Sequence, residues 1–155
     1  MLAPVAIWLL WRQRAPLALF VVVAATGSSV LNAEVKTAVG RLRPVFSDPV
    51  AHEPGLSFPS GHAQTAMVGY AVLLLVLLPA LHGVWRSVAV TFALFMVAAI
   101  GFSRLALGVH YLSDVVGGYL LGAAWVVAMT ATFNAMGRGT GRSHPDDGGS
   151  RRRGV

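Results

Sequence analysis

The sequence predicts an all-α fold, a polytopic membrane helix bundle of four full transmembrane helices preceded by a partial helix. Of its 155 residues 55% are hydrophobic and 12% are charged, and the mean hydropathy is +0.67. Soluble domains carry about 25% charged residues. The chain also contains four long segments without a charge. Lipid offers no water to exposed backbone groups, so such segments are expected to be helices.

The chain begins with an apolar stretch, residues 1–11. At 1.5 Å per residue this stretch extends only about 16 Å, which is too short to cross a bilayer. It lacks the basic region and the small-residue cleavage site of a signal peptide. We interpret it as the end of a helix whose beginning is missing.

The four charge-free segments approach or exceed the length that a spanning helix needs, about 20 residues with a range of roughly 17–25. They are residues 15–33, 63–81, 87–103 and 115–137. An extended extracytoplasmic loop is predicted between the first two, because Pro44, Pro49, Pro54 and Pro59 interrupt helix there. Residues 1–137 are therefore expected to form one membrane-embedded domain.

The tail, residues 138–155, is rich in Gly, Ser, Arg and Asp and is predicted to be disordered and cytoplasmic. This orientation places eight basic residues inside and four outside, as the positive-inside rule requires. The inner ones are Arg12, Arg14, Arg86, Arg138, Arg142, Arg151, Arg152 and Arg153. Because topology accounts for the net charge of +6, no nucleic-acid partner is expected. The chain is predicted to be a multi-pass protein of the plasma membrane.

In this topology the unusual polar residues all fall on the extracytoplasmic side. They come from three distant stretches and are Lys36 and Arg43, then Ser60, Gly61 and His62, then Ser103, Arg104, His110 and Asp114. Ionisable groups at membrane depth are costly, so a functional site is the default hypothesis for them. The chain has no cysteine, which excludes thiolate chemistry and cysteine-ligated metals.

The residue types predict a phosphate site. The cations Lys36, Arg43 and Arg104 suit a polyanion, and the guanidinium fork matches phosphate oxygens. Ser60 is positioned to cap the helix that follows, where free amides bind anions. Gly61 lets the backbone approach a ligand closely.

The two histidines predict covalent catalysis. His110 and Asp114 are four residues apart and are expected to share a helix face, so that the carboxylate holds one ring nitrogen and the other attacks. His62 is the candidate acid for the leaving oxygen. These roles need a neutral His110 and a protonated His62, which requires different surroundings for the two rings. The competing interpretation of His110 with Asp114 is a structural pair.

Three motifs carry a family resemblance. They are K-x6-R-P from Lys36 to Pro44, P-S-G-H from Pro59 to His62, and S-R-x5-H-x3-D from Ser103 to Asp114. Together they resemble the type 2 phosphatidic acid phosphatase family of membrane lipid phosphate phosphatases. Vanadium haloperoxidases share similar motifs, but four membrane segments argue against a soluble haloperoxidase.

The resemblance implies a metal-independent lipid phosphatase without cofactors. His110 would become the phosphohistidine, Asp114 would orient it, and His62 would act as acid and then assist water. The phosphate-binding residues would be Lys36, Arg43, Ser60, Gly61 and Arg104. Phosphatidic acid, phosphatidylglycerol phosphate and polyprenyl diphosphate are the expected substrates. Membrane members usually have six helices, so the chain is expected to be incomplete at its N-terminus relative to the family.

Two other functions stay open from the sequence: a phosphotransferase of the same chemistry, and an inactive lipid-binding membrane subunit. The oligomeric state is not readable. Outside the motifs, Arg41 is interpreted as a surface or lipid-headgroup residue, and His52 and Glu53 as solvated loop residues. Gly118 and Gly122, four residues apart, are expected to permit close contact between helices.

Overall fold

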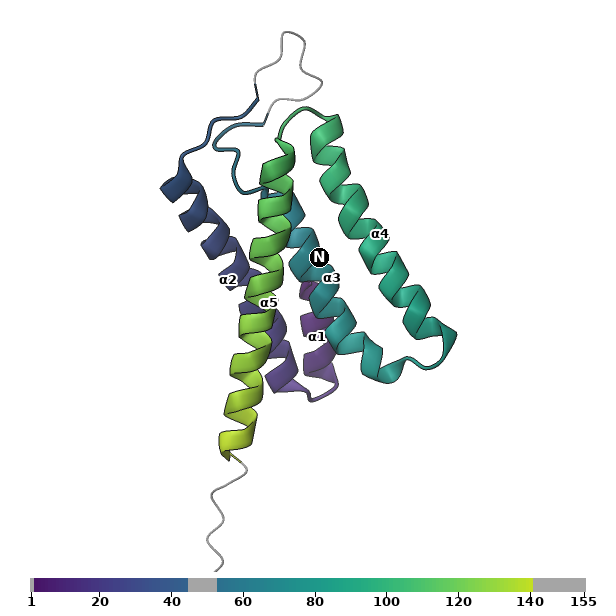
Figure 1. Cartoon of the computed structure of the whole chain (residues 1–155). Helices are drawn as coiled ribbons and strands as arrows, with labels where there is room; N and C mark the ends of the chain where they lie inside the picture. The colour runs from purple at the N-terminus through teal and green to yellow at the C-terminus, as the bar shows by residue number, and fades with distance from the viewer. Residues whose placement is uncertain (1, 45–52, 141–155) are drawn as a thin grey trace, which may run out of the picture.

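The computed structural model describes residues 2–44 and 53–140 as a bundle of helices (Figure 1). Within these residues there is no strand, so the predicted all-α fold is confirmed. The elements are α1 (Ala3–Trp11), α2 (Ala15–Val39), α3 (Gly61–Leu77), η1 (Leu78–Ala80), α4 (Val84–Ala106) and α5 (Leu112–Thr140). The central helix is α3, which packs against α2, α4 and α5.

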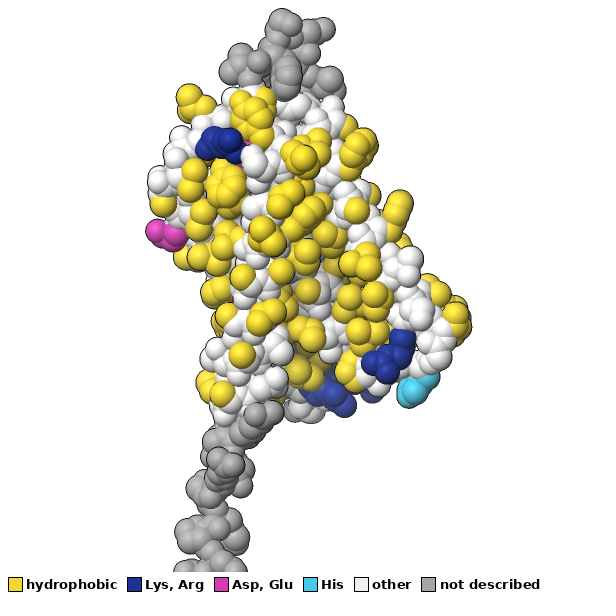
Figure 2. Space-filling view, in the orientation of Figure 1, with side chains coloured by type: hydrophobic (Ala, Val, Ile, Leu, Met, Phe, Trp, Pro, Cys, Tyr) yellow, Lys and Arg dark blue, Asp and Glu magenta, His cyan; other side chains and the backbone are white. Residues whose placement is uncertain are grey.

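Four apolar helices in the described part of the chain are long enough to cross a membrane, as predicted. They comprise Ala15–Val39, Gly61–Ala80, Val84–Ala106 and Leu112–Met136. The face in Figure 2 is largely apolar between its two ends, and its basic side chains gather at those ends. Such a belt of apolar side chains matches the hydrocarbon layer of a bilayer.

Helices α2, α4 and α5 extend beyond the charge-free segments, whereas α3 ends at Leu77 and is followed by η1, which ends at Ala80. Helix α2 continues past the predicted segment end at residue 33 to Val39, so Lys36 lies in its last turn. The Gly40 amide donates the last helical hydrogen bond to the Lys36 carbonyl at 2.9 Å, and the positive φ of Gly40, 63°, then turns the chain out of the helix. A charged residue marks the end of an apolar segment in the sequence. The helical hydrogen bonds, however, continue until a residue such as Gly40 ends the helix.

Helix α5 likewise continues to Thr140, past the predicted domain end at residue 137. The remainder of the predicted tail, residues 141–155, lies outside the described residues, as do residues 45–52 of the predicted loop. The described flanks of that loop contain no helix or strand.

The short helix α1 is part of the hydrophobic core. It packs against α2, and its Leu9 is only 1% exposed. The core comprises Leu2, Ala6, Leu9, Ala18, Phe20, Val21, Ala24, Val68, Val72 and Val126.

Helices α3 and α5 approach closely because glycines line their contact. A Cβ atom on Gly118 would lie 2.6 Å from the Ser60 carbonyl oxygen, and one on Gly122 would lie 3.1 Å from that of Gln64. The prediction of close helix contact at these glycines is therefore confirmed. The Ser60 amide donates to the Asp114 carbonyl at 2.9 Å, so the first turns of both helices meet at one end of the bundle.

Candidate active site

The three motif segments converge at the end of the bundle where α2 ends and α3 and α5 begin (Figure 1). Ser60 caps α3: its backbone is extended, and its hydroxyl accepts from the Ala63 amide at 3.5 Å. This confirms the predicted helix cap. Ser60 is fully buried and joined through its amide to Asp114, so the second and third motifs form one structural unit.

The imidazole of His110 lies against the Asp114 carboxylate, with Nδ1 3.4 Å from Oδ2. Both side chains are buried, at 1% and 0% exposure. The predicted geometry was wrong in one respect: α5 begins at Leu112, so His110 lies in the turn before the helix and shares no helix face with Asp114. The turn still brings the two groups together and leaves Nε2 pointing away from the carboxylate.

Asp114 is held by several other donors. Its Oδ2 accepts from the Tyr111 amide at 2.8 Å and from the hydroxyl of fully buried Ser57. Its Oδ1 accepts from Arg41 Nη1 at 2.9 Å. The surface interpretation of Arg41 was therefore incomplete, because its half-exposed side chain pairs with a fully buried carboxylate. Neither Arg41 nor Ser57 belongs to a motif, and their partners lie far away in sequence, so no local pattern marked them.

Arg43 lies beside the second ring nitrogen of His110. Its Nη1 is 3.3 Å from His110 Nε2 and donates to the Val109 carbonyl at 2.9 Å. Its Nε is buried and has no hydrogen-bond partner among the described residues. A buried donor without a partner is unfavourable, so this N–H is suited to an oxygen of a bound anion.

Glu53 bridges two of the predicted phosphate-binding cations. One carboxylate oxygen is 3.1 Å from Arg43 and the other is 3.1 Å from Arg104. The interpretation of Glu53 as a solvated loop residue was wrong, because its carboxylate is an ion-pair partner inside the site. Its neighbour His52 lies outside the described residues. A carboxylate between two arginines shows that their guanidinium groups converge on one anion.

The surroundings of His110 favour its neutral form. Burial lowers the pKa of the imidazole below its ordinary value of 6.5, and the Arg43 charge lowers it further. The hydrogen bond to Asp114 opposes this shift without overcoming it. A neutral ring with Nδ1 directed at a carboxylate has its lone pair on Nε2, the state that a nucleophile needs.

Lys36 reaches the same end of the bundle from the last turn of α2, where its ammonium donates to the Leu56 carbonyl at 2.7 Å. Among the described residues, no cluster of three or more His, Cys, Asp or Glu side chains could hold a metal ion. The groups that surround the His110 ring are mainly cations. The site is therefore suited to an anion.

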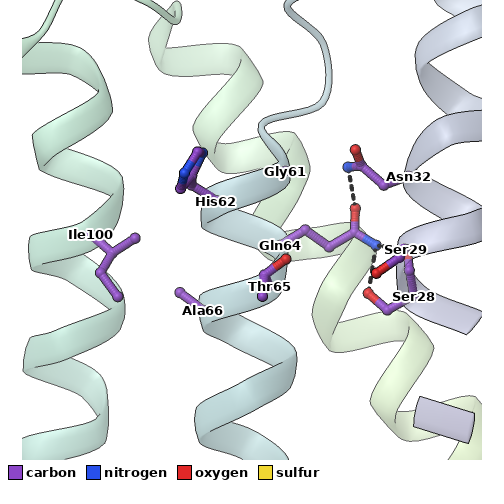
Figure 3. A pocket seen from close by; sticks show the side chains of 9 residues that line it. All are labelled: Ser28, Ser29, Asn32, Gly61, His62, Gln64, Thr65, Ala66 and Ile100. Atoms are coloured by element: carbon purple, nitrogen blue, oxygen red, sulfur yellow. Dashed lines mark hydrogen bonds between the residues drawn. The ribbon is translucent and has the colours of Figure 1, made fainter. Parts of the chain in front are cut away.

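His62 occupies different surroundings. It is exposed, and it lines a cavity of about 460 Å³ between α2, α3 and α4 (Figure 3). The other lining residues are Ser28, Ser29, Asn32, Gly61, Gln64, Thr65, Ala66 and Ile100. None of the arginines or His110 lines this cavity. Figure 3 shows His62 on the side of α3 nearer Ile100, with Gln64 directed toward α2.

Residues 15–138 match the family model described as the PAP2 superfamily. The chain belongs to this superfamily. The predicted resemblance to type 2 phosphatidic acid phosphatases is thereby confirmed. The three motifs that carried it are the segments that converge at one end of the bundle.

Two relatives are similar to this PAP2 chain. Phosphatidylglycerophosphatase B of Bacillus subtilis (strain 168) is 38% identical over 95 residues, which cover 60% of this chain and 46% of the relative. The chain thus spans about half the length of that curated protein. A crystal structure of a transmembrane PAP2 type phosphatidylglycerolphosphate phosphatase from Bacillus subtilis superposes with a TM-score of 0.75 and 29% identity, covering 87% of this chain and 70% of that one. Together with the four apolar helices, this identifies a multi-pass membrane protein.

Proposed function

We propose that this chain is a metal-independent phosphatase that hydrolyses a lipid phosphate through a phosphohistidine on His110. The observation that carries the proposal is the position of His110 Nε2, 3.3 Å from Arg43 and opposite the nitrogen held by Asp114. The nucleophilic atom and a phosphate-binding donor therefore face the same space. Both relatives carry names of phosphatidylglycerophosphate phosphatases, which supports the same activity.

In the first step the Nε2 lone pair attacks phosphorus as the bond to the lipid oxygen breaks. The electron pair of that bond passes to the oxygen, and protonated His62 donates a proton to it. The products are the free alcohol and phosphohistidine. Arg43 and Arg104 stabilise the charge on the equatorial phosphate oxygens, and fixed donors of this kind contribute most of the rate enhancement in many enzymes. The phosphate displaces the Glu53 carboxylate from them.

In the second step water attacks the phosphorus of phosphohistidine. Neutral His62 takes a proton from that water, the phosphorus–nitrogen bond breaks, and its electron pair returns to Nε2. Inorganic phosphate leaves, and both histidines regain their starting states. Asp114 holds the ring in one tautomer throughout, as a carboxylate does in other acid–base assemblies.

The cavity beside His62 suits the alcohol of the substrate. It adjoins the residue that protonates the leaving oxygen, and its volume falls in the range of about 300–1,000 Å³ that is typical of ligand pockets. Phosphatidylglycerol phosphate, phosphatidic acid and a polyprenyl diphosphate are the candidate substrates. All three place a phosphate at the membrane surface and an apolar tail within it.

The proposed topology puts the active site on the extracytoplasmic face and residues 138–155 in the cytoplasm. Because the chain has no cysteine, single cysteines report this directly. Leu42→Cys lies beside the site and Trp85→Cys at the other end, and both native side chains are exposed. A membrane-impermeant thiol reagent on intact cells should label Leu42→Cys alone; labelling of Trp85→Cys alone would reverse the topology.

The activity is tested with protein purified in detergent. Release of inorganic phosphate from the three lipids should proceed unchanged in the presence of a chelator, and vanadate should inhibit it. His110→Ala should lower kcat by about 10⁴-fold or more, because it removes the nucleophile. Radiolabelled substrate should leave a phosphoenzyme on the wild type and none on His110→Ala.

His82→Ala is the matched control, since His82 lies before α4 at the other end of the bundle. It should retain wild-type turnover. A wild-type protein that binds the lipids without releasing phosphate would instead be a binding subunit. Transfer of phosphate to an added alcohol in preference to water would identify a phosphotransferase.

A further inference from the structure

Asp114 has more partners than its role toward His110 requires. One side of the carboxylate, Oδ2, faces His110 and accepts from Ser57 and from the Tyr111 amide. The other side, Oδ1, accepts only from Arg41 among the described residues. An unpaired carboxylate without exposure would be strongly unfavourable, so these donors stabilise its charged form.

Three contacts hold the Arg41 guanidinium in place. Its Nη1 donates to Asp114 and also to the Ser113 hydroxyl at 2.7 Å. Its central carbon lies 4.9 Å from the centre of the Tyr111 ring, within the range of a cation–π contact. Ser113 and Tyr111, which both precede Asp114 in the sequence, thus orient the guanidinium toward the carboxylate.

Arg41 and Ser57 are also joined to each other. The Ser57 amide donates to the Arg41 carbonyl at 2.8 Å, so the two residues lie side by side although they are sixteen positions apart. Their side chains then reach opposite oxygens of Asp114. The backbone hydrogen bond therefore fixes the distance between the two residues whose side chains hold the Asp114 carboxylate from either side.

We propose that Arg41 and Ser57 form a positioning pair that orients Asp114 and, through it, the His110 ring for attack. The inference rests on the proposed function of His110. Arg41 also balances the carboxylate charge that the ring experiences. Neither residue touches the reacting atoms, so their effect is on geometry and basicity.

The two residues should act differently on His110. The other charged groups around the ring are Arg43 and Lys36, with Glu53 bound to Arg43. Removing Arg41 leaves the Asp114 charge unbalanced, which favours the imidazolium and raises the pKa of His110. Ser57 is neutral, so its loss should disturb orientation with little change in basicity.

The experiment compares Arg41→Ala, Arg41→Lys and Ser57→Ala in kcat, KM and pH profile. Arg41→Ala should lower kcat about a hundredfold, since small misplacements of reacting groups have effects of that size. It should also move the acidic limb of kcat/KM up by about half a pH unit, a modest shift because the ion pair is partly exposed. Arg41→Lys should return the midpoint of the acidic limb to the wild-type value but should recover only part of kcat. Ser57→Ala should lower kcat about tenfold with the limb unmoved.

Arg12→Ala is the matched control, because Arg12 also stacks on an aromatic ring, Trp8, at the other end of the bundle. It should match the wild type. A rise in KM with unchanged kcat in Arg41→Ala would indicate contact with the lipid headgroup, and wild-type values in both alanine variants would indicate a purely structural role. Either outcome overturns the proposal.

A second readout separates this inference from the proposed function. Isotope-labelled histidines can be titrated by NMR without turnover, and His110→Ala identifies the resonance. Arg41→Ala should raise the titration midpoint of His110, and an unmoved midpoint would refute the pairing even if the enzyme is active. If the wild type were inactive but Arg41→Ala still raised the titration midpoint of His110, the proposed phosphatase function would be refuted. The proposed link from Arg41 through Asp114 to His110 would then still stand.

Discussion

His110 and His62, the proposed nucleophile and the proposed acid, lie in contrasting environments. His110 is buried, and Asp114 and Arg43 contact its two ring nitrogens. His62 is exposed and makes no hydrogen bond within the described residues. It borders an open cavity that the arginines do not line. The proposed nucleophile is thus held in place by its neighbours, whereas the proposed acid is accessible.

The difference suits the two roles. A nucleophile gains from a fixed ring and a pKa that keeps it neutral. An acid must exchange protons with water in each cycle and must meet alcohols of different shapes. The hydrogen bonds and ion pairs are thus concentrated around His110, where the proposed function places the phosphate.

His62→Ala should produce the largest effect beyond that of the nucleophile. General acid catalysis contributes about 10²–10⁴-fold, so kcat on lipid phosphates should fall by that amount. With an aryl phosphate, whose leaving group needs no proton, the loss in phosphoenzyme formation should be much smaller. Rapid-quench measurement of phosphoenzyme with both substrates checks this.

Equal losses with both substrates would contradict the acid role. They would indicate that His62 binds phosphate, as the residues around His110 do, and the contrast between the two histidines would disappear. His82→Ala is again the control for a histidine outside the site.

Gly118→Ala should disturb the contact between α3 and α5, which brings the second and third motifs together. The new Cβ would meet the rigid Ser60 carbonyl at 2.6 Å and push α3 from α5. Such overpacking costs typically about 1–3 kcal/mol, so thermal unfolding in detergent should occur at a lower temperature. Gly117→Ala meets only the Phe58 ring, which can shift, and should be milder. A reversed order would contradict this packing.

Glu53→Gln should strengthen anion binding by roughly tenfold, because it removes a charge that competes for Arg43 and Arg104. The inhibition constant of vanadate measures this affinity. Glu34→Gln, an exposed position on α2, is the control. Weaker inhibition by vanadate in Glu53→Gln would mean that Glu53 organises the arginines and does not compete with the ligand.

The smallest expected effect is in the pH profile. Burial and Arg43 lower the pKa of His110, so its neutral form persists below pH 6.5. The acidic limb of kcat/KM, corrected for substrate ionisation, should therefore have its midpoint below 6.5. A midpoint at or above that value would mean that the Asp114 hydrogen bond outweighs burial and charge.

Much of the fold was predictable because hydropathy reports burial in lipid directly. The four helices were located by the absence of charge, and Gly118 and Gly122 marked a close contact. The ends were less predictable. The last turn of α2 contains Lys36, and only the positive φ of Gly40 shows where the helix ends.

The proximity of His110, Asp114 and Arg43 was predictable because their motifs have fixed spacing, and the structure brings the three side chains together. Arg41 and Glu53 were misread for a physical reason. Arg41 pairs with Asp114, 73 positions away, and Glu53 joins Arg43 to Arg104, which is 51 positions away from it, so the fold between these residues decides the contacts. Composition cannot distinguish a solvated loop carboxylate from one that bridges two arginines.

The amide of Gln64 donates to Ser28, and its oxygen accepts from Asn32 at 2.6 Å. These side-chain hydrogen bonds join α2 to the first turn of α3 beside the cavity that Gln64 lines. Turning α3 about its axis by one residue would break all three bonds. The rotation of this helix is thereby locked, and the direction in which His62 points, two residues earlier in the chain, is set by a side chain that takes no part in the chemistry (Figure 3).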